Sequence, residues 1–149
     1  MTPPLSIIVP PSTSFLSPIR GMVTSWLGLN QLRADRWCLV VTELVTNAMT
    51  VTGADQVVTV DLAITGTEVE LSVGDGGPGV ELQPIAQPDP TAPRGRGLLI
   101  VDALTSALRS ERRDGTTVIS CRRSVADDRT GSGSAQIGPE LFQGAPQQA

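Results

Sequence analysis

Residues 41–52 read VTELVTNAMTVT, and this segment carries the clearest functional pattern in the chain. Apolar side chains recur through it at helical spacing and predict one buried stripe on an α-helix, made of Trp37, Val41, Leu44, Ala48 and Val51. Glu43 and Asn47 lie beside that stripe, so their side chains project from one face of the helix, one turn apart. A carboxylate and a carboxamide at the edge of a buried face need a ligand, a metal ion or water as a partner. The polar side of an ordinary amphipathic helix explains the same two residues, so the segment needs support from elsewhere in the chain.

The composition limits the classes of protein that the sequence can encode. The chain has 149 residues, of which 40% are hydrophobic, and this predicts one domain with a substantial core. A net charge of -4 argues against nucleic acid as a direct partner, because no basic excess is available to neutralise phosphates. All 11 basic residues are arginine and there is no histidine. A catalytic lysine, a histidine nucleophile, a histidine metal ligand and phosphorylation of this chain on histidine are therefore excluded.

The cysteines and the apolar runs indicate the setting in which the chain works. Cys38 and Cys121 are too few for a disulfide scaffold or a tetrahedral zinc site, so we expect buried free thiols. No apolar run approaches the roughly 20 residues that cross a bilayer, and the N-terminus lacks the charged start of a signal peptide. We expect a reducing, cytoplasmic location and no membrane partner.

Periodicity and turn residues predict an α+β fold, a two-layer α/β sandwich whose mostly antiparallel sheet carries helices on one face. Residues 1–13 hold four prolines and a short apolar run, which fits an edge strand or an ordered N-terminal arm. Helices are expected over residues 17–27, 32–52 and 98–104, and strands over residues 57–64, 68–73, 107–112 and 116–122. The last two strands are joined at Asp114 and Gly115, a strong hairpin signal. Residues 14–124 form the predicted domain, and residues 125–149 a disordered tail rich in Gly, Ser, Gln and Pro.

Two glycine clusters support the pattern on the helix. GDGGPG at residues 74–79 follows a predicted strand, and GRG at residues 95–97 precedes a predicted helix. Glycines at such places let a backbone approach a ligand closely, and a helix N-terminus after a glycine-rich turn suits phosphate. Residues 80–93, with four prolines, fit a lid, a binding loop or disorder. DGGPG alone is most often a tight turn and GRG alone is a weak signal, so only the order and spacing of all three segments together indicate a ligand site.

Each polar residue in these segments has a chemical use. Asn47 offers an oxygen to Mg²⁺, an ion that takes few protein ligands beside water and substrate phosphates. Asp75 is a fixed acceptor that suits the exocyclic amine of adenine. Glu43 is then available as a general base.

ELVTN on a helix, DGGPG after a strand and GRGL before a helix resemble the N, G1 and G2 boxes of the gyrase and histidine-kinase type (Bergerat) ATP-binding fold. The resemblance covers residues 14–123, and the small size is similar to the anti-sigma factor serine/threonine-protein kinases. It implies that Glu43 polarises the attacking hydroxyl, that Asn47 ligates Mg²⁺, and that Asp75 reads the adenine amino group. It implies a lid at residues 80–94. The remaining implied ATP-binding residues are Gly77, Gly79, Arg94, Gly95, Arg96, Gly97, Leu98 and Thr117. Arg96 fits a solvated surface residue equally well.

The resemblance implies two possible activities. The first is Mg²⁺- and ATP-dependent phosphorylation of a serine or threonine on an anti-anti-sigma (STAS-type) partner, together with sequestration of a sigma factor. The second is a nucleotide-binding regulatory module that sequesters a partner without kinase activity. Glu43 favours the first, whereas Met49, Thr50 and Val51 favour the second because many relatives carry a basic residue there. The family often forms homodimers. In the tail, Ile137, Leu141 and Phe142 fit a docking motif or disorder without function.

Overall fold

The computed structural model describes residues 2–75 and 93–129. Five strands form one sheet in the order β1-β2-β3-β5-β4, and every neighbouring pair is antiparallel. The strands are β1 (Leu5–Val9), β2 (Val58–Thr65), β3 (Glu68–Asp75), β4 (Ser106–Arg113) and β5 (Thr116–Ser124). The helices are the short 3₁₀ helix η1 (Thr13–Phe15), α1 (Leu16–Leu29), α2 (Asp35–Val51), α3 (Pro93–Leu104) and the one-turn α4 (Val125–Asp128).

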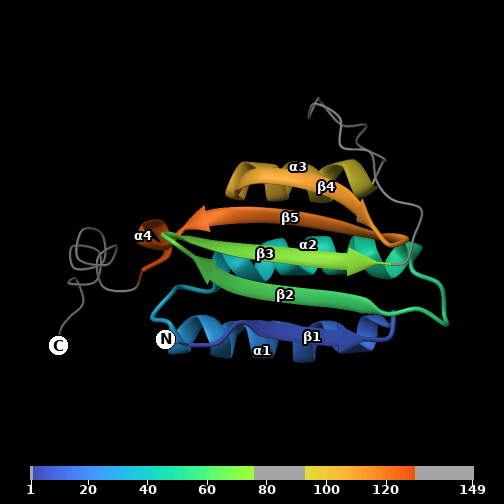
Figure 1. Ribbon diagram of the computed structural model, residues 1–149, viewed down its shortest axis with the longest axis horizontal. Coiled ribbons are helices and arrows are strands. Elements are labelled where there is room, and N and C mark those ends of the chain that lie inside the picture. The colour runs from blue at the N-terminus through green and yellow to red at the C-terminus, as the bar shows by residue number, and fades with distance from the viewer. Residues whose placement is uncertain (1, 76–92, 130–149) are drawn as a thin grey trace.

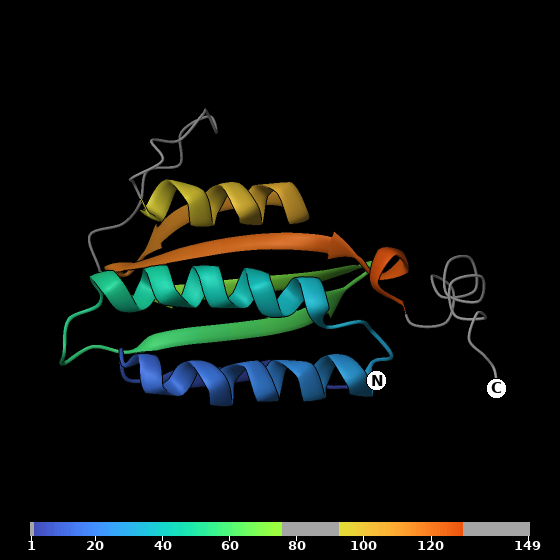
Figure 2. The same ribbon diagram turned by 180° about the vertical axis from the view of Figure 1, so that it is seen from behind.

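Helices α1, α2 and α3 all cover one face of the sheet, as the opposite views of Figures 1 and 2 show. The predicted α+β two-layer sandwich is therefore confirmed. The strand alternation explains the layering, because Val69, Leu71 and Val73 of β3 are buried while the residues between them are half-buried. Within the described residues, no helix is both long and apolar enough to cross a membrane.

Helix α2 is the centre of the core. The apolar stripe predicted for it is present and wider than expected, since Val40, Val45 and Met49 are buried beside the predicted residues, while Val51 is half-buried. Trp37 is the largest fully buried side chain of the described chain. Each aliphatic side chain buried in this way contributes about 1.5–3 kcal/mol. This burial fixes α2 against the sheet, and with it the position of the polar residues along the edge of the helix.

Two element boundaries next to the glycine clusters differ from the sequence prediction. Strand β3 does not end at residue 73 but includes Gly74 and Asp75, which pair with Val118 and Thr117 of β5. A methyl group at Gly74 would lie 2.6 Å from Thr59 Oγ1, so this glycine serves close packing between strands and not a turn. Helix α3 begins at Pro93, five positions early, because proline is pre-organised for the first helical position.

The two chain ends also depart from the prediction. Of the two readings of residues 1–13, the edge strand is present, since β1 pairs with β2 along its whole length. The predicted tail begins too early, because Val125–Asp128 forms α4, capped by the Ser124 hydroxyl, which accepts a hydrogen bond from the Ala126 N–H at 3.2 Å. The rest of that tail, with Ile137, Leu141 and Phe142, lies outside the described residues.

Candidate functional site

Helix α2 presents Glu43 and Asn47 at the place where it touches α3. Both side chains are half-buried, and Gly97 of α3 is buried against them. A methyl group at Gly97 would lie 2.7 Å from Glu43 Oε1 and 3.6 Å from Asn47 Nδ2. The first distance is too short for a carbon–oxygen contact, so glycine is what lets the α3 backbone approach the carboxylate this closely. The structure thus brings the acid, the amide and the second glycine cluster together.

A second group of predicted residues meets across the strands. Asp75 ends β3 and is directly opposite Thr117 of β5. Asp75 is 3% exposed and Thr117 is fully buried, and both lie on the helix-covered face because they continue the rows of Val73 and Ile119. Side chains of directly opposed residues are near neighbours on one face of a sheet. A buried carboxylate and a buried hydroxyl therefore stand side by side where β3 ends.

The two groups lie at the same end of the molecule. In Figures 1 and 2, the end of β3, the C-terminal end of α2 and the beginning of α3 are all at one end of the sheet. Glu43 and Asn47 project from α2, Gly97 lies in the first part of α3, and Asp75 is the last residue of β3. Three segments far apart in the sequence are therefore assembled at one end of the fold.

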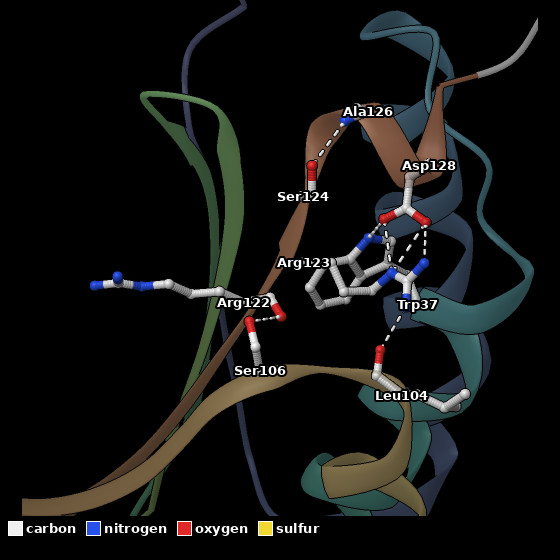
Figure 3. Close-up of polar contacts among 8 residues, drawn as sticks. All are labelled: Trp37, Leu104, Ser106, Arg122, Arg123, Ser124, Ala126 and Asp128. Carbon is white, nitrogen blue, oxygen red and sulfur yellow. Dashed lines mark hydrogen bonds and ion pairs between the residues drawn. The ribbon is translucent and has the colours of Figure 1, made fainter. Parts of the chain in front are cut away.

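At the opposite end of the molecule, hydrogen bonds and an ion pair join α2, α3 and α4 to the sheet (Figure 3). The Arg123 guanidinium of β5 binds both oxygens of Asp128, with Nη2 2.8 Å from Oδ1 and Nε 2.9 Å from Oδ2. Trp37 Nε1 of α2 donates to the same carboxylate at 2.8 Å, and Arg123 Nη1 donates to the carbonyl of Leu104, the last residue of α3. The hydrogen bond to Asp128 raises the pKa of Arg123, so this cation persists throughout the working pH range. We call Trp37, Leu104, Arg123 and Asp128 the latch.

The latch connects α2 and α3 at this end of the molecule. Arg123 satisfies a carbonyl at the C-terminus of α3, where a cation is also favoured by the helix dipole. Through Asp128 it also reaches Trp37 near the beginning of α2. The two helices that bring Glu43 and Gly97 together are thus fixed at the end away from that contact.

The remaining predicted site residues either lie outside the described residues or occupy a different position from the one predicted. Gly77, Gly79 and residues 80–92 of the predicted lid lie outside the described residues. Arg94, Gly95 and Arg96 do not precede a helix as predicted, because they lie in the first turns of α3. The first N–H groups of any α-helix lack an acceptor within the helix, so this stretch still offers donors to an anion. Leu98 is half-buried and packs on the core.

Comparison with known proteins places the chain in a family. A model of the histidine kinase-like ATPase domain matches residues 9–123. The chain belongs to this family. The match spans the same boxes that the sequence analysis related to the Bergerat ATP-binding fold, so that resemblance is confirmed. A comparison with curated protein sequences finds no match.

Solved structures of similar fold are found as well. The RsbU and RsbW domains of Rv1364c from Mycobacterium tuberculosis match with a TM-score of 0.63 and 23% identity, over 83% of this chain and 33% of that one. The catalytic domain of histidine kinase ThkA matches with a TM-score of 0.53 and 16% identity, over 83% of this chain and 97% of that one. This ATPase domain therefore spans about a third of the length of the first structure. At these identities the likeness establishes the fold.

ATP is the ligand that the family implies, and the residues present suit it. The close α2–α3 contact at Gly97 leaves Glu43 and Asn47 beside the helix that carries the glycine cluster. No group of three or more His, Cys, Asp or Glu side chains that could hold a metal ion occurs in the part of the chain that the structure describes. Mg²⁺ takes few protein ligands and completes its shell with water and phosphate oxygens, so one amide oxygen would be a sufficient side-chain contribution. Asn47 is the amide that would serve it.

One polar neighbour of the site in this ATPase domain was not predicted from the sequence. Arg112 of β4 is opposite Thr117, and its Nη1 donates to the Thr117 hydroxyl at 2.9 Å. The signal was available, because a two-residue turn at Asp114 and Gly115 places residue 112 opposite residue 117. The latch was also missed, and no local pattern reveals it, since Trp37 and Asp128 are 91 positions apart.

Proposed function

We propose that this ATPase domain is a protein kinase that phosphorylates a serine or threonine hydroxyl on a partner protein. The observation that carries the proposal is the meeting of Glu43 with Gly97, with Asn47 one turn further along α2. When bound, ATP with Mg²⁺ supplies the phosphoryl group and the positive charge that phosphoryl transfer needs. Glu43 is the base that accepts the proton of the attacking hydroxyl, and Asn47 is the ligand for Mg²⁺.

The remaining roles in the proposal divide between the two ends of the nucleotide. Asp75, Gly77, Gly79 and Thr117 hold the adenine base, and the burial of Asp75 beside Thr117 supports a pocket with fixed polar groups. The start of α3 binds the phosphates, and the residues involved are Arg94, Gly95, Arg96, Gly97 and Leu98. Residues 80–94 serve as the lid.

The proposed partner is a small anti-anti-sigma protein of the STAS type, and the proposal includes sequestration of a sigma factor. Two observations support this class of partner. The three sequence boxes and the small size resemble the anti-sigma factor serine/threonine kinases. One structure of similar fold is described as containing an RsbW domain.

A second candidate function is a nucleotide-binding module that sequesters a partner without phosphorylating it. The residues that follow Asn47 favour it, because Met49 is buried and the Thr50 hydroxyl donates to the Thr46 carbonyl at 2.8 Å. Neither side chain supplies a positive charge for phosphate at the position where many relatives carry one.

Labelled ATP separates the two candidates. The full chain is incubated with γ-labelled ATP, Mg²⁺ and a purified STAS-type protein, and label on the partner is followed with time. A kinase transfers label in the wild type and not in Glu43→Ala, because the base is missing. Absence of label on the partner, combined with the same ATP affinity in wild type and Glu43→Ala, would refute the kinase and leave the binding module.

A further inference from the structure

The end of the sheet away from Asp75 carries a pocket of about 400 Å³. The pocket lies between α4 and the turn that joins β2 to β3, which are neighbours in both Figures 1 and 2. Ile64 and Val125 give it an apolar lining, and Thr67, Ala126 and Arg129 line it as well. Ile64 is 36% exposed although it lies on the helix-covered face, opposite the buried Val69. An exposed apolar side chain in a hollow is a place where another apolar segment can bind.

The walls of this pocket are held in place by hydrogen bonds. The Val125 N–H donates to the Thr67 carbonyl at 2.8 Å, which joins α4 to the β2–β3 turn across the pocket. The Arg33 N–H donates to the Asp128 carbonyl at 2.6 Å, and the Asp128 side chain belongs to the latch. Because α4 is fixed on both sides, the pocket exists before anything binds to it, and a ligand need not create it.

The chain itself brings a matching segment to the rim of the pocket. Arg129 is the last described residue and lines the pocket, so the following residues leave from its edge. Residues 137–142 read IGPELF and contain all three large apolar side chains of residues 130–149. Residues 130–136 number seven and span up to about 25 Å when extended, which is enough for the IGPELF segment to return to the pocket.

Charge and tethering favour this segment over a separate molecule. Arg129 is the charged residue among those that line the pocket, and Glu140 is the charged side chain of residues 130–149, so the two have opposite signs. A short Gly- and Ser-rich tether such as TGSGSAQ gives an effective concentration of about 1 mM. At that concentration a weak intrinsic Kd of about 0.1 mM already gives a docked-to-free ratio of about ten.

We propose that the IGPELF segment docks in the pocket between α4 and the β2–β3 turn of its own chain. Leu141 and Phe142 cover Ile64 and Val125, and Glu140 pairs with Arg129. The pocket and the contact at Gly97 are at opposite ends of the molecule, so this inference does not depend on the proposed nucleotide site.

The test is hydrogen–deuterium exchange of the full chain, read on the peptide that covers residues 137–142. Ala126→Glu places an acid in the pocket without changing that peptide, and it opposes Glu140. Ala126 is exposed and lies in the first turn of α4, where an acid is favoured, so the fold should tolerate the change. Ala54→Glu is the matched control, because Ala54 is exposed in the loop between α2 and β2. We expect the peptide to exchange about tenfold faster in Ala126→Glu than in the wild type, and at the wild-type rate in Ala54→Glu.

A change in the segment itself gives the reciprocal measurement. Leu141→Ser/Phe142→Ser should speed exchange in the peptides that cover residues 64–67 and 124–129, whereas the control Gln143→Ser/Ala145→Ser should not.

Equal exchange of residues 137–142 in the wild type and Ala126→Glu overturns the inference, since the segment is then free or bound elsewhere. Equal acceleration by Ala54→Glu overturns it as well, because the effect would be one of net charge. Protection that rises with protein concentration assigns the pocket to the segment of a second copy and refutes docking within one chain.

Discussion

Replacing Gly97 by alanine separates the stability of the fold from the function of the site. The new methyl group would lie 2.7 Å from Glu43 Oε1, so one of the two must move. The carboxylate is the far end of a flexible side chain, whereas the α3 backbone is fixed by the latch at its other end. We therefore expect Glu43 to turn away and α3 to stay in place.

Gly97→Ala has two effects on the free energy of unfolding, and they nearly cancel. Alanine in a helix interior is favoured over glycine by about 0.8–1.0 kcal/mol. A side chain forced away from its preferred rotamer costs about 0.5–1.5 kcal/mol. Gly21→Ala in α1 is the matched control, because nothing lies within 4 Å of the added methyl group. Gly21→Ala should gain the full helix propensity of alanine, which for a chain of this size raises Tm by roughly 2–4 °C. The Tm of Gly97→Ala should stay near that of the wild type.

The functional consequence is larger. A positioned general base contributes about 10²–10⁴-fold to the rate, so a displaced Glu43 should lower phosphoryl transfer from ATP at least tenfold. Thermal unfolding and the transfer rate are measured for wild type, Gly97→Ala, Gly21→Ala and the double variant Glu43→Ala/Gly97→Ala. In the double variant the clash is gone, so Gly97→Ala should stabilise the Glu43→Ala protein as much as Gly21→Ala stabilises the wild type. Equal stabilisation by Gly97→Ala and Gly21→Ala in the wild type, with full activity, would refute the contact between α2 and α3.

Three other expectations follow from the same contacts. Burial raises the pKa of the Cys121 thiol from 9.0 to about 12, so above pH 9 the unfolded chain releases a proton that the folded chain keeps. The free energy of unfolding should fall as pH rises from 9 to 12, by up to about 1.4 kcal/mol per unit, and urea titrations of Cys121→Ala should lack that slope. Asp128→Asn should cost about 3 kcal/mol in the same assay, because it leaves the half-buried Arg123 without its carboxylate. Glu68→Gln, which faces Arg122 at 3.5 Å on the surface, should cost less than about 1 kcal/mol. Asn47→Ala should abolish the Mg²⁺-dependent rise in Tm with ATP, and an undiminished rise would count against Asn47 as the metal ligand.

The accuracy of the sequence reading depended on whether a pattern has one physical meaning or several. The stripe on α2 and the turn at Asp114 and Gly115 each have one strong reading, and both elements are present. A glycine has several possible readings. Gly74 was predicted to end a strand, although it lies inside β3, where only a hydrogen atom fits against Thr59. The position of Gly97 inside α3 was missed for the same reason. Sequence alone does not distinguish a glycine that bends the chain from one that admits a neighbour.

The latch and the Gly97 contact hold α2 and α3 together at opposite ends of the two helices. Arg123 and Asp128 fix α2 and α3 at one end, where buried charge and hydrogen bonds give a large energy. Gly97 lets the same helices meet at the other end, where the contact contributes little energy and sets the position of Glu43. Substitutions in the latch should therefore change stability while leaving the ATP affinity of the folded fraction unaltered. Substitutions at Gly97 should change activity with little effect on stability. A latch variant such as Asp128→Asn that lost ATP affinity while folded would show that the two ends are coupled, and that the helices move as one unit.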